Sequence, residues 1–356
     1  MKDFIKYFDK VTFLILIFLV SIGIMIIYSA SHGLSQSYHL KQILWLCISL
    51  IAFLIVFRMK SEVIFKSAIP IFIALVFVLF FQIIAGRIIS GTRSWMKIGF
   101  LSVQFSEFIK IPLALLVAQM LAKSTIIDWK TFAKLLAVVG LPFMLIALQP
   151  DMGTAFILIS VLLISVLLKR IRIWVLIISL LVGMAGAVLT WNYVLKPYQK
   201  ERIRSFINPS QYKKSSGYQI IQSKIAIGSG GLYGKGYLKG SQSEYRFLPT
   251  QHTDFVFSVL GEELGFMGVT GLFFLFFVLF YRQLFFKTES ASEFYFVCIF
   301  NGLIFFQFLI NILMSIGLLP VLGIPLPFVS YGGSSLLAFF IGEGIIFRVR
   351  INSYIQ

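Results

Sequence analysis

One carboxylate, Asp254, stands where the chain changes from a long polar stretch to an apolar run that begins at Phe255. The polar stretch, residues 192–254, is basic and rich in glycine. An ionisable group at the edge of a membrane helix is costly to bury, so its presence there indicates a function. A carboxylate in that position can accept a proton from a substrate, which makes Asp254 the first candidate for catalysis.

Three further ionisable residues, Glu107, Lys110 and Asp151, stand at the beginning of other apolar runs. Glu107 and Lys110 are three positions apart, so they share one face of a helix and can form an ion pair. Acidic residues are also favoured in the first turn of a helix, where they cap it and interact with its dipole. We therefore expect a structural ion pair for Glu107 and Lys110, and both capping and catalysis stay open for Asp254.

The composition indicates a membrane protein. The chain has 356 residues, of which 59% are hydrophobic, and its mean hydropathy is +0.94. Soluble proteins are about 45–50% apolar. The net charge of +17 then reflects orientation signals and attraction to anionic membrane lipid, and we expect no nucleic-acid partner. Cys47 and Cys298 lie inside apolar runs, which favours buried thiols over a disulfide or a metal pair.

Apolar segments long enough, or nearly long enough, to cross a bilayer occur about ten times. They cover residues 11–30, 40–57, 65–85, 105–121, 132–149, 151–168, 171–191, 255–281, 294–316 and 334–349. The sequence therefore predicts an all-α polytopic membrane protein with about ten transmembrane helices. We expect a single domain over residues 1–356, with both termini in the cytoplasm and residues 192–254 as one large extracytoplasmic loop.

The distribution of lysine and arginine supports this orientation. With the N-terminus in the cytoplasm, basic residues accumulate in the cytoplasmic segments, whereas the outer loops near 31–39 and 317–333 contain none. Two outer loops are exceptions: residues 86–104, which contain Arg93, and the long loop 192–254. A basic outer surface is suited to an anionic ligand. In this orientation Glu107, Lys110, Asp151 and Asp254 all lie near the outer membrane face.

Other motifs are weaker. His32, His39 and His252 lack the spacing of metal ligands. The glycine-rich run 228–236 does not match a nucleotide phosphate loop, because serine occupies the first glycine position and no serine or threonine follows Lys235. Residues 218–227 have apolar side chains at helical spacing and predict an interfacial helix on the outer leaflet or over a cavity. Three prolines within residues 317–333 predict an irregular outer loop.

Together these motifs resemble those of one family over nearly the whole chain: the SEDS (shape, elongation, division and sporulation) glycosyltransferases. The matching runs are 91–95 (GTRSW), 106–110 (SEFIK), 149–154 (QPDMGT), 217–219 (GYQ), 226–231 (AIGSGG), 252–255 (HTDF), 261–265 (GEELG) and 327–335 (PFVSYGGSS). Residues 239–243 and 247–249 are more similar to the elongation branch than to the division branch. Ser94 and Phe105 depart from the family pattern, which commonly has arginine and proline there.

The resemblance implies a peptidoglycan glycosyltransferase that polymerises lipid II, a disaccharide-pentapeptide on undecaprenyl pyrophosphate, during cell elongation and cell-shape maintenance. It implies a multi-pass protein of the bacterial cytoplasmic membrane whose active site faces the extracytoplasmic side. It assigns the key acid to Asp254 and substrate-binding positions to Arg93, Glu107, Lys110 and Asp151. It also implies a class B penicillin-binding protein, which supplies the transpeptidase, and the elongation machinery as partners.

In the expected reaction Asp254 is the general base. It takes a proton from the C4 hydroxyl of the acceptor sugar, which attacks the anomeric carbon that carries pyrophosphate. Cations then stabilise the leaving pyrophosphate. Lys110 and Arg93 are the first candidates for this, followed by Arg202, Arg204, Lys239 and Arg246 of the long loop. A divalent cation, Mg²⁺ or Mn²⁺, could bridge acid and pyrophosphate, although the sequence shows no dedicated ligand set.

Two other functions stay open on sequence grounds. A transporter or flippase for lipid II would also have many spans with buried charges, and Glu262, Glu263 and Glu343 would be its best candidates for a translocation path. The same glutamates could instead be packing groups inside the bundle. A third alternative is a scaffold that only positions the penicillin-binding protein.

Overall fold

The computed structural model describes residues 7–32, 36–85, 87–89, 92–98, 101–175, 177–179, 181, 192, 197–212, 216–245 and 247–355. Seven helical spans within these ranges are long and apolar enough to cross a membrane. They are α2 (Lys10–Ala30), α3 (Tyr38–Arg58), α4 (Ser61–Ala85), the consecutive helices α5 (Phe105–Phe108) and α6 (Lys110–Lys123), α7 (Trp129–Leu148), α13 (Val256–Leu284) and α14 (Ala291–Ser315). The predicted helical polytopic membrane fold is confirmed.

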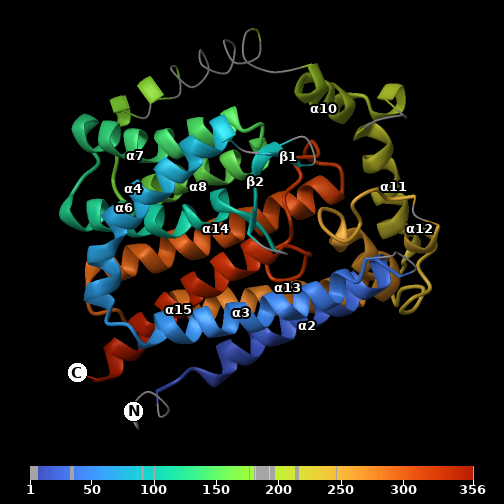
Figure 1. Cartoon of the computed structure of the whole chain (residues 1–356), viewed down its shortest axis with the longest axis horizontal. Helices are drawn as coiled ribbons and strands as arrows, with labels where there is room; N and C mark the ends of the chain where they lie inside the picture. Colours follow the sequence, from blue (N-terminus) through green and yellow to red (C-terminus); the bar gives the residue numbers. More distant parts are fainter. Residues whose placement is uncertain are drawn as a thin grey trace.

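The three remaining predicted spans differ from these seven. The segment 151–168 forms α8 (Met152–Leu168), which is apolar but only 17 residues long. The last segment forms α15 (Gly333–Ile355), a helix that carries three charged residues. The prediction for 171–191 falls largely outside the described residues. Figure 1 shows that α2 begins and α15 ends at the same end of the bundle.

Short polar residues determine where several helices begin. The carboxylates of Asp9, Asp128 and Asp151 each accept a hydrogen bond from the backbone N–H three residues later, at the starts of α2, α7 and α8. Ser290 and Glu293 form a reciprocal capping box at the start of α14. Such caps satisfy amide groups that have no partner within the helix. The capping role considered for acids in first turns is therefore observed for Asp151.

A small antiparallel sheet in the loop 86–104 was not predicted from the sequence. Its strands are β1 (Arg87–Ile89), β2 (Thr92–Ile98) and β3 (Leu101–Gln104), in the order β1-β2-β3. Trp95 pairs with Arg87 on one side and with Gln104 on the other. β3 leads directly into α5, so the hairpin sets the position of the helix start that carries Glu107.

The long polar stretch folds largely into helices: α10 (Pro197–Ile207), a 3₁₀ turn η2 (Pro209–Tyr212), α11 (Ser216–Ser229) and α12 (Ser241–Glu244). These elements lie at the end of the bundle away from the start of α2 (Figure 1). The predicted helix over 218–227 is confirmed as part of α11. Its Ile220 and Ala226 are buried with Phe255 and Met314, so its apolar side packs on protein.

Candidate active site

Asp254 lies at the end of a tight turn that immediately precedes α13. Its backbone N–H donates to the carbonyl of Thr250 at 3.1 Å. The irregular segment 320–332, which lies between α14 and α15, holds this turn from outside. Ser330 donates its hydroxyl to the Thr253 carbonyl at 2.5 Å, and the N–H of Tyr331 donates to the His252 carbonyl at 3.0 Å. The position of Asp254 therefore depends on a segment more than sixty residues later in the chain.

A side chain of α14 also holds the backbone of Asp254 by a hydrogen bond. The side-chain amide of Asn311 donates to the Asp254 carbonyl at 2.9 Å and to the Ile324 carbonyl at 2.7 Å. Asn311 is fully buried. The carboxylate Oδ2 of Asp254 faces Gly323, where a Cβ atom would lie 3.6 Å from it. One buried amide thus fixes the backbone of the candidate base against the neighbouring loop.

The environment of Asp254 suits a base that works near neutral pH. Burial raises the pKa of its carboxyl to about 6, against hydrogen bonding with Thr253 and Thr250 and against the positive charge of Arg202, which lower it. The side chain itself is half-buried. Arg202, on α10, also donates to the Val321 carbonyl at 3.4 Å, so it belongs to the same loop environment. General-base catalysis is most efficient when the pKa lies near the working pH.

Glu107 and Lys110 form the predicted ion pair. Lys110 Nζ lies 2.9 Å from Glu107 Oε2, and their side chains are only 3% and 5% exposed. Lys110 also donates to Gln307 Oε1 at 3.0 Å, and the Gln307 amide in turn donates to the Pro325 carbonyl at 3.0 Å. The third side of the ammonium group faces the ring of Phe339 at 5.7 Å. The pair is thereby connected to the segment 320–332.

Asp151 lies close to Glu107, on the same side of the site as the ion pair. Besides capping α8, it accepts a hydrogen bond from the Gln104 amide at 2.6 Å and from the Ser106 hydroxyl at 3.4 Å. Burial raises the pKa of its carboxyl, and the negative charge of nearby Glu107 adds to the rise. At Gly153 a Cβ atom would lie 2.6 Å from the Leu322 carbonyl, so the start of α8 also meets the segment 320–332.

The structure therefore brings Glu107, Lys110 and Asp151 together and links them to Asp254 through the segment 320–332. Arg93 lies in β2, and its side chain is outside the described part of the structure. Among the loop cations, Arg204 and Lys239 are exposed, and Arg246 lies outside the described residues. Within the described ranges no group of three or more His, Cys, Asp or Glu side chains is arranged to hold a metal ion.

Sequence reasoning missed Gln307 and Asn311. Both are buried on α14, four residues apart in an otherwise apolar span. That spacing places them on one helix face. Polar side chains inside a membrane helix are a usable sign of internal contacts, but the sequence does not show which carbonyl groups they reach.

The glutamates considered for a translocation path have partners of their own. Glu262 binds Lys235 at 2.7 Å, and Glu263 binds Ser29. Glu343 is fully buried and accepts a hydrogen bond from Gln283 at 2.5 Å. These contacts agree with the packing role that was the alternative.

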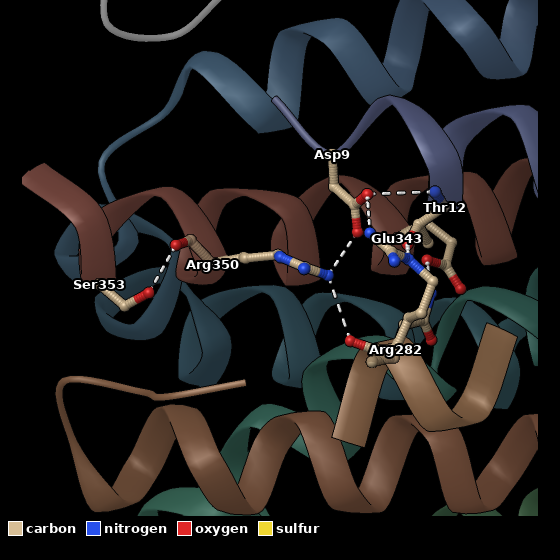
Figure 2. A network of polar contacts seen from close by, with 7 residues as sticks. Asp9, Thr12, Arg282, Glu343, Arg350 and Ser353 are labelled. Carbon is tan, nitrogen blue, oxygen red and sulfur yellow. Dashed lines mark hydrogen bonds and ion pairs between the residues drawn. The ribbon is translucent and has the colours of Figure 1, made fainter. Parts of the chain in front are cut away.

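Near Glu343, Asp9 binds both Arg282 and Arg350, so that α2, α13 and α15 are joined where α2 begins (Figure 2). Hydrogen bonds tie this network together: Arg282 Nε donates to the Thr12 hydroxyl at 3.1 Å, and Arg350 donates to the Arg282 carbonyl at 3.1 Å. Burial opposes ionisation of Asp9, yet the hydrogen bonds from Thr12 and Arg282 and the charge of Arg350 hold its pKa below the usual value. This cluster is structural and lies at the end of the bundle away from α10–α12.

The fold is that of a known family of membrane proteins. The family model described as cell cycle proteins of the FtsW, RodA and SpoVE type matches residues 9–355. The chain belongs to this family, which is the SEDS family indicated by the sequence motifs.

Relatives match this chain over nearly its full length. The chain is 33% identical to the peptidoglycan glycosyltransferase RodA of Treponema pallidum, with 96% of this chain and 97% of the relative covered. It is 34% identical to the peptidoglycan glycosyltransferase MrdB of Escherichia coli, with 97% and 94% covered. A probable peptidoglycan glycosyltransferase FtsW of Coxiella burnetii is also 34% identical, with 93% of each chain covered.

A solved structure shows the same fold. The chain superposes with a TM-score of 0.82 and 29% identity on a chain of a peptidoglycan synthase complex, described as coordinating polymerization and crosslinking. The match covers 98% of this chain and 99% of that chain.

Proposed function

We propose that this protein is a peptidoglycan glycosyltransferase of the elongation type, with Asp254 as its general base and lipid II as its substrate. The main support for the proposal is that Asp254 and Lys110 are both connected by hydrogen bonds to the segment 320–332. The backbone of Asp254 and the ammonium group of Lys110 are tied, through Asn311 and Gln307, to the adjacent carbonyls of the segment 320–332. A base with a pKa near neutrality and the buried ion pair of Glu107 and Lys110 are thus attached to one loop segment.

The bond changes of this reaction are simple. The C4 hydroxyl oxygen of the acceptor sugar forms a bond to the anomeric carbon of the donor, and its proton passes to the Asp254 carboxylate. The bond from the anomeric carbon to the pyrophosphate oxygen breaks, and the electron pair leaves with the pyrophosphate. Direct displacement inverts the α-linked donor to a β-1,4 product. A positioned base contributes about 10²–10⁴-fold to such a rate.

The remaining acceleration must come from positive charge near the leaving group. Arg202 is the cation whose charge reaches the Asp254 carboxyl, and exposed Arg204 lies two residues further on α10. We assign Arg202 the contact with pyrophosphate. Lys110 has two of its donors engaged by Glu107 and Gln307 and is almost fully buried. We therefore assign Lys110 and Glu107 a bracing role beneath the substrate, with Asp151 and Arg93 as further binding positions.

The charge pattern and the arrangement of the helices support a proposal for the location of the site. The predicted cytoplasmic segments are rich in lysine and arginine, and α10–α12 lie away from the end where α2 begins (Figure 1). We place the site on the extracytoplasmic face of the bacterial cytoplasmic membrane. We also propose a class B penicillin-binding protein of the elongation machinery as partner, because the structural relative comes from a complex that coordinates polymerization and crosslinking.

The experiment is polymerisation of fluorescent lipid II by the purified protein, with and without its penicillin-binding partner, read as glycan length on a gel. Asp254→Asn must lose polymer, whereas the matched control Glu62→Gln, an exposed acid on α4, must retain it. Equal rates for Asp254→Asn and the parent would refute the assignment. Reconstituted protein that moves lipid II between leaflets without forming polymer would indicate a flippase instead.

A further inference from the structure

Helix α13 is interrupted at Gly265, whose φ of 65° and ψ of −163° are not helical. The interruption divides α13 into residues 256–264 and 266–284. A Cβ atom at position 265 would lie 2.2 Å from the Gly234 nitrogen, so the close approach of another segment requires glycine here. That segment is the loop that follows α11.

The loop replaces the helical hydrogen bonds that the interruption removes. The N–H groups of Phe266 and Met267 donate to the carbonyls of Gly231 and Leu232 at 2.9 and 3.1 Å. In return, the carbonyls of Glu262 and Glu263 accept from the N–H groups of residues 235 and 236, both at 3.0 Å. Irregular backbone at membrane depth is tolerated only when its polar groups are satisfied in this way.

The part of α13 after the interruption has the length of a complete membrane span. Residues 266–284 are nineteen residues long and rise about 28 Å, which matches a hydrocarbon core of about 30 Å. Phe266 and Met267 are both exposed at the beginning of this segment, as lipid-facing side chains would be. Because Gly231 and Leu232 are hydrogen-bonded to these two residues, the loop reaches the same depth.

Helix α2 gives an independent measure of that depth. The hydroxyl of Tyr237 donates to the Met25 carbonyl at 3.1 Å. Met25 precedes the end of α2 at Ala30 by five residues, which corresponds to about 7 Å along a helix. Ser29, in the last turn of α2, binds Glu263. Residues 231–239 therefore lie beside the last turns of α2 and the first turn of the 266–284 segment.

The exposed side chains of residues 231–239 are those of a membrane interface. Tyr233 is 78% exposed, Leu232 52% and Leu238 42%. The segment contains two lysines and no acidic residue, and Lys239 is exposed. Tyrosine is enriched at membrane interfaces, and lysine can extend its charge to lipid phosphates. We infer that residues 231–239 form a membrane anchor that inserts Leu232, Tyr233 and Leu238 into the lipid leaflet beside Phe266.

The anchor also holds the short helix 256–264, which follows Asp254 directly. Lys235 binds Glu262 at 2.7 Å, and Glu262 accepts two further hydrogen bonds, from the Ser241 hydroxyl and the Gln242 N–H, both at 3.1 Å. The height of residues 256–264 above the bilayer is thus set by the anchor. The inference does not depend on the proposed glycosyltransferase activity, since depth is measured without substrate.

A spin-label experiment tests the anchor. In a Cys47→Ser, Cys298→Ser background of the full chain, a nitroxide is attached at Tyr233→Cys. Two matched reference sites are Phe274→Cys, on the exposed face of the 266–284 segment, and Gln36→Cys, an exposed position two residues before α3. The protein is reconstituted in phosphatidylethanolamine–phosphatidylglycerol nanodiscs. Collisions of the label with oxygen, which concentrates in lipid, are compared with collisions with a water-soluble nickel chelate.

The expected oxygen-to-nickel ratio at position 233 is several-fold above that at position 36 and below that at position 274, which lies about 12 Å deeper along the helix. A ratio equal to that at position 36 would overturn the anchor, and so would low collision with both reagents, which would indicate cover by protein. Leu238→Cys provides a second label site in the same segment. Its oxygen-to-nickel ratio must also be higher than the ratio at position 36.

Discussion

Gln307 and Asn311 lie one turn apart on α14 and donate to two successive carbonyls, those of Pro325 and Ile324. Gln307 also accepts from Lys110, and Asn311 also donates to the Asp254 carbonyl. The two amides therefore connect the candidate base with the buried ion pair through a single loop segment. The side-chain nitrogens of both amides are hydrogen-bonded, which offsets the cost of burying them.

The first prediction concerns Asn311. Asn311→Ala removes two buried hydrogen bonds, frees the backbone of Asp254, and should lower kcat for lipid II polymerisation about 10-fold or more, with a smaller change in KM. The matched control is Asn301→Ala, a buried asparagine of α14 whose amide donates to the Val297 carbonyl of its own helix. Equal loss of kcat in both variants would indicate general destabilisation of α14 rather than positioning of Asp254.

The second prediction is the pH dependence of polymerisation. A general base works only when ionised, and burial raises the pKa of Asp254 to about 6. We expect kcat/KM to rise about tenfold per pH unit below 6 and to level off above 7. The measurement is the initial rate in a series of buffers from pH 5 to 8.5. A flat profile through pH 6 would exclude Asp254 as the titrating base.

The third prediction concerns the effect of the raised pKa of Asp254 on the stability of the protein. A carboxyl whose folded pKa exceeds its unfolded value destabilises the folded state at pH values above the folded pKa, and this cost disappears below the unfolded pKa. Asp254→Asn should therefore increase the free energy of unfolding in detergent at pH 8, by about 3 kcal/mol at most. The increase is measured as a higher unfolding temperature. The gain should vanish near pH 4. A variant less stable than the parent at pH 8 contradicts the raised pKa.

The fourth prediction separates bracing from substrate contact at Lys110. Lys110→Met leaves Glu107 buried without its cation, which costs about 3–5 kcal/mol. The double variant Glu107→Gln, Lys110→Met removes both charges and should recover most of the thermal stability and part of the activity. A double variant that is stable but inactive would show that Lys110 contacts the substrate directly.

The fifth prediction addresses Asp9, away from the site. Asp9→Asn breaks the contacts that join α2 to Arg282 and Arg350, and should lower the unfolding temperature without changing kcat per folded molecule. Because the folded pKa of Asp9 is depressed, its contribution is complete above the unfolded pKa and is lost as pH falls through the folded pKa. The two proteins should therefore converge in stability in strong acid. An unchanged unfolding temperature at pH 7 contradicts a structural role.

A chelator titration tests the remaining expectation, a divalent cation. Because the described residues bring no three metal-binding side chains together, a bound Mg²⁺ or Mn²⁺ would have to be held with help from the substrate pyrophosphate. Activity that EDTA abolishes and that added Mg²⁺ or Mn²⁺ restores would support this proposal. Full activity in EDTA would show that the reaction needs no divalent cation.

The sequence by itself determined the membrane class, most of the helices, the cap at Asp151 and the pairing of Glu107 with Lys110. Each of these depends on composition or on residues within one or two helical turns, where helix geometry alone brings side chains together. The same argument identified Asp254 as the acid at a helix start, because an ionisable group there is unusual whatever it contacts.

Only the tertiary structure decided how these parts meet. The hydrogen bond from Asn311 to Asp254 spans 57 residues, and the one from Lys110 to Gln307 spans 197. The hairpin before α5 and the interruption of α13 at Gly265 likewise depend on partners far along the chain. No local propensity encodes such contacts, because backbone carbonyls accept hydrogen bonds at every residue. Packing of the whole bundle selects which carbonyls the buried amides of α14 reach.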